Sequence, residues 1–217
     1  MDLPDTLPPL TAFKRAALAN HGFLLVDVAP TEPEYHAVLA RLGLPATGHP
    51  SYPTIVERVY NPRLEAAFDA RVAEITARRG TVPVLLFPMF HGTTEVALNA
   101  IMREGFDPTK NRVSAYGRGT YFARDYALSA NFSREDQHGY KIMFACKVIK
   151  GKSEIGKANQ SWDTKLWDSF TNGSDSIVVS PYPDGAVPLY VVRWYGFVPG
   201  TQDQVQYFSS KLRTIIT

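Results

Sequence analysis

Two stretches of this sequence decide its fold: LFPMFHGT at residues 86–93 and GTYFA at residues 119–123. Both join apolar and aromatic residues into short runs, which is typical of β-strands. After the second run, Asp125 caps a predicted helix that carries Ser129 and Phe132. Side chains three positions apart project from one helix face, so these two residues are expected to contact the same neighbour.

The rest of the chain alternates further short strands with short helices. Strands are predicted at residues 23–28, 54–60, 84–90, 120–123, 141–149, 176–180 and 189–195. Helices are predicted at residues 12–19, from 31 to 42, from Asn61-Pro62 to about Ala77, and from Glu95 to Glu104. This order predicts an α+β fold with split antiparallel β-sheets and short flanking helices. Residues 1–30 are expected to be an N-terminal extension, and residues 31–217 the main domain.

The composition is that of an ordinary globular protein. The 217 residues fit one domain, 45% of them are hydrophobic, and 20% are charged. The net charge of +2, from 23 basic and 21 acidic residues, gives no strong field that would favour nucleic acid or a membrane. The single cysteine, Cys146, lies in an apolar run and is expected to be a buried, inert thiol. The N-terminus lacks a signal-peptide pattern, so an intracellular protein, cytoplasmic or nuclear, is expected. A monomer without membrane contact is also expected.

Four residues have the chemistry needed to bind and cleave a nicotinamide nucleotide. Breaking the bond between nicotinamide and ribose requires a grip on the carboxamide and flat contacts with the pyridinium ring. Gly92 lets the backbone approach the carboxamide, and Ser129 supplies a further hydrogen bond. Tyr121 and Phe132 supply aromatic faces for a cationic ring.

Each candidate residue also has an ordinary structural interpretation. His91 could bond to the backbone after an apolar strand, and Tyr121 could be a plain strand aromatic. Ser129 could bond the carbonyl one turn earlier in its helix, and Phe132 could belong to the core. Only the combination of these residues favours a nucleotide site.

Six segments, taken in order, resemble the catalytic domain of the poly(ADP-ribose) polymerase family, which has the diphtheria-toxin-like ADP-ribosyltransferase fold. The resemblance covers roughly residues 31–200. The segments are IVERVYNPRL (55–64), LFPMFHGT (86–93), YGRGTYFA (116–123), SANF (129–132), CKVIKG (146–151) and DSIVVSP (175–181). The resemblance implies NAD as the co-substrate and no metal. Residues 1–30 are too few for the family's helical regulatory domain, so none is expected.

The resemblance also implies a role for each candidate residue. His91 would hydrogen-bond a ribose hydroxyl of NAD and act in catalysis together with Tyr121. Gly92 and Ser129 would hold the carboxamide, while Tyr121 and Phe132 would flank the nicotinamide. Phe132 takes the place of a tyrosine that is common at this position.

Three further residues are implied to contact the donor. Thr93 and Tyr116 would line the cofactor pocket. Arg112 belongs to residues 109–115, which match the loop that lies over the donor site in the family, and it would face the pyrophosphate.

The third catalytic position departs from the family pattern. The family has a glutamate there, at the start of a late strand, and the corresponding run in this chain is PLYVV at residues 188–192. Leu189 would stand in place of the glutamate, and leucine cannot polarise an incoming sugar hydroxyl. Polymer formation is therefore not expected. Ser176 is a second candidate for this position, and Asp184 is the nearest preceding acidic residue that could substitute.

The implied activity is NAD-dependent mono-ADP-ribosyl transfer to a protein acceptor, with release of nicotinamide. A nucleic-acid end is an alternative acceptor that the composition does not support. A different function is also open: an inactive module of the same fold that binds NAD or a partner without turnover. The leucine at position 189 is the feature that keeps this alternative open.

Overall fold

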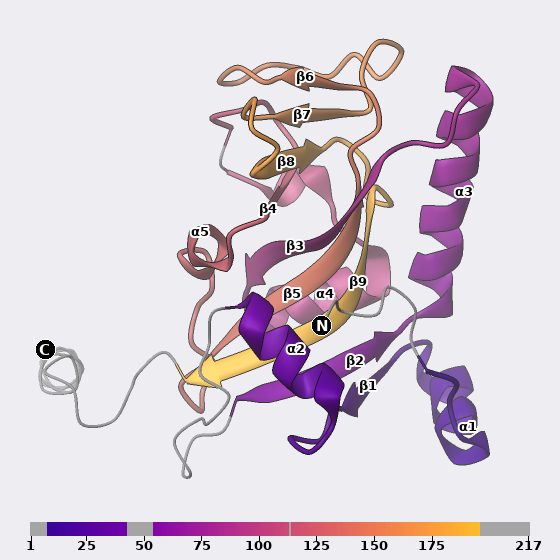
Figure 1. The fold of residues 1–217 in the computed structure, drawn as a ribbon, viewed down its shortest axis with the longest axis vertical. Helices are drawn as coiled ribbons and strands as arrows, with labels where there is room; N and C mark the ends of the chain where they lie inside the picture. Colours follow the sequence, from indigo (N-terminus) through magenta and orange to yellow (C-terminus); the bar gives the residue numbers. More distant parts are fainter. Residues whose placement is uncertain (1–7, 43–53, 113, 196–217) are drawn as a thin grey trace, which may run out of the picture.

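The computed structural model describes residues 8–42, 54–112 and 114–195, and Figure 1 shows its fold. The helices of these residues are α1 (Ala12–His21), α2 (Pro33–Arg41), α3 (Pro62–Arg79), α4 (Glu95–Glu104), the 3-10 helix η1 (Pro108–Lys110) and α5 (Tyr126–Ala130). The strands are β1 (Leu24–Asp27), β2 (Ile55–Tyr60), β3 (Leu85–Thr93), β4 (Thr120–Ala123), β5 (Tyr140–Ile149), β6 (Ser153–Ile155), β7 (Ser169–Thr171), β8 (Ile177–Ser180) and β9 (Ala186–Tyr195). These elements confirm the predicted α+β class.

The strands form one hydrogen-bonded sheet in the order β1-β2-β9-β5-β3-β4-β8-β7-β6. Neighbouring strands are antiparallel except β6 and β7, which run parallel. β3 and β4 register at a single residue pair, Phe90 with Ala123. The predicted split is therefore a narrow join inside one sheet, between β1-β2-β9-β5-β3 and β4-β8-β7-β6 (Figure 1).

Local sequence signals set the boundaries of the longest helix. α3 begins after Asn61, whose side chain accepts a hydrogen bond from the amide of Leu64, and a proline occupies its first turn. It ends before Gly80, which adopts a left-handed φ of 76° that favours glycine. The predicted helix from Asn61-Pro62 to about Ala77 is thus confirmed.

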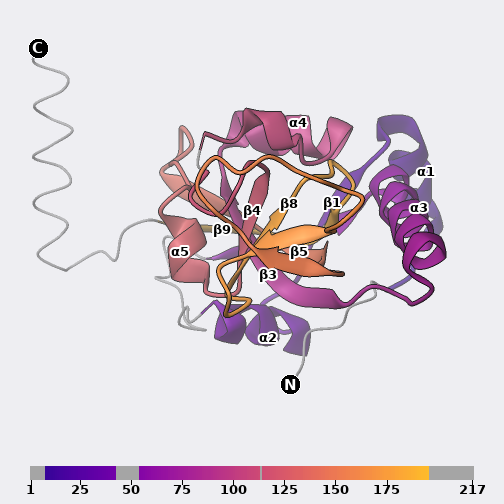
Figure 2. The same cartoon turned by 90° about the horizontal axis from the view of Figure 1, so that it is seen from above.

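Helices cover both faces of the central strands. Figure 2 shows α2 and α4 on opposite sides of the sheet, with α3 beside it. The core under α2 contains Leu39 and Phe90, and the core under α4 contains Leu98 and Met89. Phe90 and Met89 are neighbours on β3, and they face opposite cores because strand side chains alternate.

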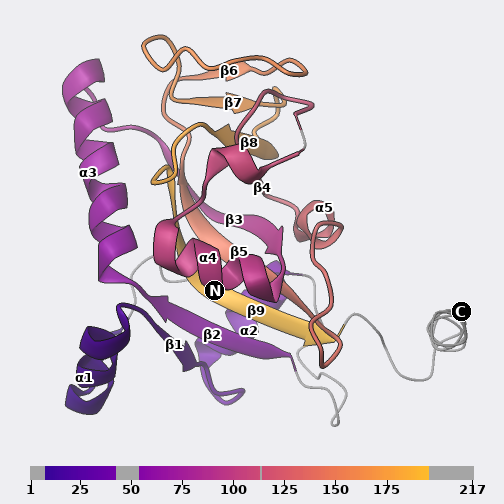
Figure 3. The same ribbon diagram turned by 180° about the vertical axis from the view of Figure 1, so that it is seen from behind.

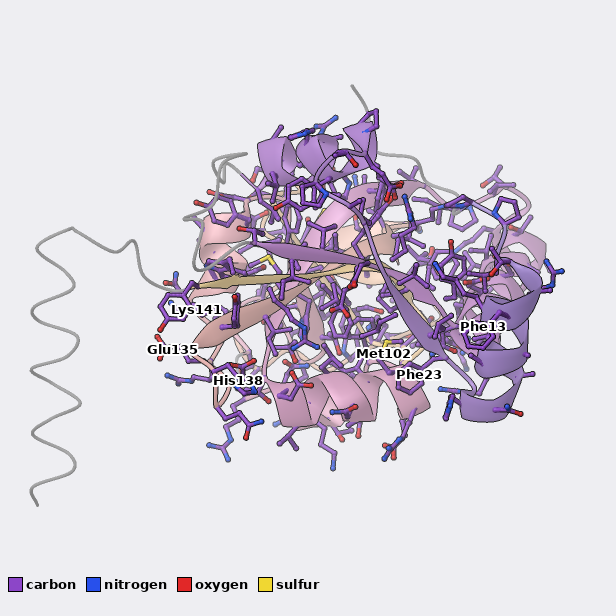
Figure 4. The ribbon with its side chains drawn as sticks, turned by 90° about the horizontal axis from the view of Figure 1, so that it is seen from below. Phe13, Phe23, Met102, Glu135, His138 and Lys141 are labelled. Carbon is purple, nitrogen blue, oxygen red and sulfur yellow. The ribbon has the colours of Figure 1, made fainter. Side chains whose placement is uncertain are left out.

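The expected N-terminal extension contains α1 and β1. β1 pairs with β2 from Leu24 opposite Tyr60 onward, which confirms the predicted strand at residues 23–28 and makes β1 an edge of the sheet. Phe23 packs against the core under α4, to which Met102 belongs (Figure 4). Phe13 of α1, labelled in the same view, is 84% exposed.

Cys146 lies on the central strand β5 and is buried, as predicted. Burial raises the pKa of its thiol well above the usual value, which keeps the sulfur protonated and unreactive. Among the residues described, none of the helices combines the length and the apolar character that a membrane span needs.

Candidate active site

A cavity of about 350 Å³ lies where β3 and β4 separate beyond their single residue pair. Its walls include six residues that the sequence singled out: His91, Gly92, Thr93, Tyr121, Ser129 and Phe132. The first three end β3, Tyr121 lies on β4, and the last two come from α5 and the turn after it. Figure 3 shows α5 near the ends of β3 and β4, with α4 in front of the sheet. The structure therefore brings these six residues together.

His91 is held as a neutral imidazole with a defined proton position. Its Nδ1 lies 2.9 Å from the carbonyl oxygen of Tyr121, and its ring packs against Phe106 and Phe122 with centroids 5.3 and 5.5 Å away. Burial lowers the pKa of His91 below its usual value, while the hydrogen bond to the carbonyl works in the opposite direction. A neutral ring that donates from Nδ1 carries its lone pair on Nε2. Nε2 can then accept a hydrogen bond from a ligand hydroxyl.

The backbone at Gly92 lies directly against α5. A Cβ at this position would lie 1.9 Å from the carbonyl oxygen of Ser129, so no side chain fits. The Ser129 hydroxyl donates a hydrogen bond of 2.8 Å to the carbonyl of Phe90 on β3, not to the carbonyl one turn earlier in its own helix. A hydroxyl that donates once keeps acceptor capacity, so Ser129 can receive an N–H from an amide.

Tyr121 is anchored by the turn that precedes β4. Its hydroxyl accepts a hydrogen bond of 2.9 Å from the Tyr116 amide and donates one of 2.6 Å to the Gly117 carbonyl. Burial raises the pKa of Tyr121 above its usual value, so the phenol stays protonated. Tyr116 is not among the described residues that line the cavity. Its amide instead holds the hydroxyl of Tyr121, which does line it.

Two more wall residues bear on what the cavity accepts. Thr93 is 4% exposed, and its Oγ1 has no hydrogen-bond partner among the described residues. An unpaired buried hydroxyl costs about 1–3 kcal/mol, and a polar ligand that bonds to it would remove that cost. Phe132 is 55% exposed at the cavity, which excludes the core interpretation. α5 ends before Phe132, whose amide donates to the Ser129 carbonyl at 3.0 Å.

The prediction for Leu189 is wrong. Leu189 lies on β9, is 5% exposed, and packs in the core under α2, whereas Ile101, Phe106 and Phe122 of the cavity lie on the α4 side. It is not among the described residues that line the cavity with His91 and Tyr121, and two strands, β5 and β3, lie between β9 and β4 in the sheet order. The residue that lines the cavity from a late strand is Ile177, which begins β8 and pairs with Ala123 of β4.

Ile177 is apolar, as Leu189 is. The late strand that lines the cavity therefore supplies no carboxylate at the third catalytic position. The sequence held a signal for Ile177, because residues 175–181 resemble the family and the neighbouring Ser176 was the second candidate for this position. Ser176 does not line the cavity, and its hydroxyl accepts a hydrogen bond from Asn172. Asp184 pairs with Arg71 at 2.9 Å and lies outside the cavity walls.

Arg112 is exposed and is not among the described residues that form the cavity wall. Lys110 and Asn111, from the predicted donor loop at residues 109–115, do line the cavity. Sequence reasoning missed the rest of the wall at the α4 and η1 end, which comprises Ala100, Ile101, Glu104, Gly105, Phe106 and Asp107. The carboxylate of Asp107 there accepts hydrogen bonds from the amide and hydroxyl of Thr109, which lower its pKa. Within the described ranges, no three His, Cys, Asp or Glu side chains gather as metal ligands would.

The wall chemistry suits a flat aromatic amide joined to a hydroxyl-bearing group. Apolar and aromatic side chains cover most of it. At the end formed by β3 and α5 the polar groups are Nε2 of His91, Oγ of Ser129 and the unpaired Oγ1 of Thr93, and charged side chains lie at the α4 and η1 end. Such a set orients a ligand through a small number of hydrogen bonds inside an apolar pocket.

Comparison with known proteins identifies relatives that match more than half of the chain. The sequence model of the poly(ADP-ribose) polymerase catalytic domain matches residues 34–177. The human protein mono-ADP-ribosyltransferase PARP14 is 30% identical over 192 residues, which cover 82% of this chain and 10% of that protein. Human protein mono-ADP-ribosyltransferase PARP12 is 29% identical over 204 residues, covering 88% of this chain and 28% of that protein. Mouse protein mono-ADP-ribosyltransferase PARP11 is 30% identical over 144 residues, or 57% of this chain and 44% of that protein. The chain thus spans less than half the length of each of these relatives.

Proposed function

The chain belongs to the poly(ADP-ribose) polymerase catalytic-domain family, and from this premise we propose that it transfers one ADP-ribose unit from NAD to a protein acceptor and releases nicotinamide. The names of the three relatives given above support a single-unit transfer, since each of the three is called a mono-ADP-ribosyltransferase. The observation that carries the proposal is the cavity in which His91, Tyr121 and Ile177 meet.

The donor is held at both sides of the bond that breaks. Nε2 of His91 accepts a hydrogen bond from a ribose hydroxyl, while the Gly92 backbone and Ser129 Oγ hold the carboxamide. The rings of Tyr121 and Phe132 flank the nicotinamide. The unpaired Thr93 Oγ1 gains a partner from the donor's polar groups.

Transfer then replaces one bond to the anomeric carbon by another. The bond from this carbon to the pyridinium nitrogen breaks, and its electron pair leaves with nicotinamide, which becomes neutral. Positive charge develops on the ribose in an oxocarbenium-like transition state, and an oxygen of the acceptor bonds to the anomeric carbon.

Ile177 limits the product to one unit. Its side chain cannot accept a proton or polarise a sugar hydroxyl, so a ribose already attached to the acceptor is a poor nucleophile. A side-chain carboxylate of the acceptor needs no such help, because it is already ionised at neutral pH. An acidic residue of a protein is therefore an acceptor whose chemistry suits this site.

The test follows label from NAD into protein and measures nicotinamide release in parallel. We expect short adducts from the wild type and none from His91→Ala or Tyr121→Ala. His138→Ala is the matched control for the first variant, because His138 is exposed in the loop before β5 (Figure 4). A ladder of long polymers would contradict the role given to Ile177, and label that persists in both cavity variants would show non-enzymatic glycation.

A second function is favoured by the same apolar residue. If the transition state of bond cleavage is too little stabilised with Ile177 at the third position, the chain binds NAD in this cavity and does not cleave it. Saturable NAD binding by calorimetry, with no nicotinamide released at any acceptor tested, distinguishes this module from the transferase.

A further inference from the structure

The segment before β4 lies beside the β6 and β7 end of the sheet in both Figure 1 and Figure 3. The loop at residues 156–168, which connects β6 to β7, carries Trp162. The Trp162 ring stacks on Phe170 of β7, with ring centroids 4.0 Å apart and planes inclined by 13°. This stacked pair abuts two glycines of the preceding segment. A Cβ at Gly117 would lie 2.3 Å from the Phe170 ring, and one at Gly119 would lie 3.0 Å from the Trp162 ring.

Hydrogen bonds join the same two segments. The Arg118 amide donates to the Gln160 carbonyl at 3.1 Å, and the Asn159 amide donates to the Ser114 carbonyl at 2.9 Å. The Ser114 hydroxyl in turn donates to the Asn159 side chain at 2.7 Å. The turn at residues 114–119 is therefore held along its length by the loop at residues 156–168.

This turn is what fixes the Tyr121 hydroxyl. The two hydrogen bonds of that hydroxyl go to the Tyr116 amide and the Gly117 carbonyl, and both groups belong to the turn. Trp162 itself does not line the cavity, so it would act through the turn. A displacement of the turn would move the phenol, and with it the aromatic face that Tyr121 presents to the cavity.

We propose that Trp162 is a positioning residue for the transfer reaction: its stack on Phe170 holds the 114–119 turn, which in turn orients Tyr121. The role in transfer rests on the proposed function above. A displacement of about 1 Å in a positioning group can lower a rate by about a hundredfold, so an indirect contact of this kind can control turnover.

The test is a double-mutant cycle on nicotinamide release. Trp162→Ala should lower kcat by about tenfold or more, with a smaller effect on KM. Trp162→Phe should retain most of the rate, because it keeps a ring on Phe170 and removes no hydrogen bond to a described residue. In a Tyr121→Phe background, where no hydroxyl remains to be oriented, Trp162→Ala should cost less than about threefold. Losses that multiply in full would overturn the proposal, as would wild-type turnover of Trp162→Ala.

Trp167→Ala is the matched control. Trp167 lies in the same loop, but the Lys152 ammonium lies over its ring, 4.9 Å from the ring centroid. Its removal should leave kcat unchanged. Ser114→Ala is a milder probe of the same connection, because it deletes only the 2.7 Å hydrogen bond to Asn159. If Trp162→Ala fails to fold in a thermal melt, a fall in kcat for Ser114→Ala supports the proposal and an unchanged kcat overturns it.

Amide hydrogen exchange separates this inference from the proposed function. Exchange at residues 114–121 should become faster in Trp162→Ala and stay at the wild-type rate in Trp167→Ala. Unchanged exchange in Trp162→Ala would overturn the connection even in an active enzyme. A wild type that releases no nicotinamide would overturn the transferase, while the exchange result would still decide whether Trp162 holds the turn.

Discussion

Replacing Gly92 by alanine should push α5 away from β3. The added Cβ would lie 1.9 Å from the Ser129 carbonyl oxygen and 2.9 Å from Ser133 Oγ, whereas ordinary contacts begin at 3.4 Å. The Ser129 carbonyl must therefore retreat by roughly 1.5 Å, the difference between 3.4 and 1.9 Å. A backbone carbonyl cannot swing aside as the end of a flexible side chain can, so the whole of α5 moves.

The energetic cost has two parts. Overpacking of a close contact costs about 1–3 kcal/mol, and the same movement breaks the 2.8 Å hydrogen bond from Ser129 to Phe90, which adds about 1 kcal/mol. A loss of about 2–4 kcal/mol in a chain of this size lowers the melting temperature by roughly 5–15 °C. If Ser129 holds the carboxamide as proposed, its displacement should lower kcat/KM for NAD by about a hundredfold.

The assay combines thermal melting with nicotinamide release. Gly80→Ala is the control, since Gly80 has a φ of +76° and nothing within 4 Å of an added Cβ. Its cost should come from the left-handed backbone alone, roughly 1–2 kcal/mol, and its kcat/KM should match the wild type. If Gly92→Ala melts within a degree of the wild type and releases nicotinamide at the normal rate, the contact between β3 and α5 is not what shapes the site.

Three further predictions test the correction at the third position, the protonation of His91 and the core. Leu189→Glu should lower the free energy of unfolding by several kcal/mol in urea, because it buries a carboxylate in the core. Ile177→Glu, at the cavity wall, should melt within a few degrees of the wild type. If Ile177→Glu proves the less stable of the two variants, Leu189 is restored to the site. The pKa of His91 is lowered in the folded state, so below pH 6.5 the unfolded chain binds a proton that the folded chain refuses, and stability falls as the pH drops. His91→Gln should remove part of this fall in melts between pH 8 and pH 5, and identical pH profiles would contradict the assignment. Arg58→Met should lower the free energy of unfolding by about 3 kcal/mol, because the half-buried carboxylate of Glu34, in the first turn of α2, loses its ion pair and keeps only the hydrogen bond from the Tyr190 hydroxyl. Arg58→Met with Glu34→Gln should recover part of that loss.

Local signals in the sequence predicted the elements that depend on local chemistry. Asp125 caps α5 by accepting from the Ala127 amide, and Thr94 caps α4 by accepting from the Ala97 amide. Such bonds form within one turn of helix, so residue type at a single position carries the information. The strands β6 and β7 were not predicted. Each has three residues, and pairing with distant segments stabilises them more than their own composition does.

The third site residue was assigned to the wrong strand for a related reason. Two runs near the end of the chain, IVVS at residues 177–180 and LYVV at residues 189–192, have nearly the same pattern of apolar residues. Such a pattern identifies a strand but does not say which neighbour it pairs with or which face meets a cavity. The sheet order decides: β8 pairs with β4, beside Tyr121, and β9 pairs with β5 and β2 in the centre.

Ile177 at the third position changes how the rest of the site must work. It brings no charge to the ribose, so it does nothing to stabilise the positive charge that develops as nicotinamide leaves. More of the rate must then come from holding the pyridinium ring and the ribose in a reactive orientation, which is the part that the proposed function gives to His91, Tyr121 and Ser129. A site that depends on orientation is sensitive to the segments that support it. The Trp162 stack and the Gly92 contact should therefore affect turnover more strongly in this chain than in a relative whose third residue is a carboxylate.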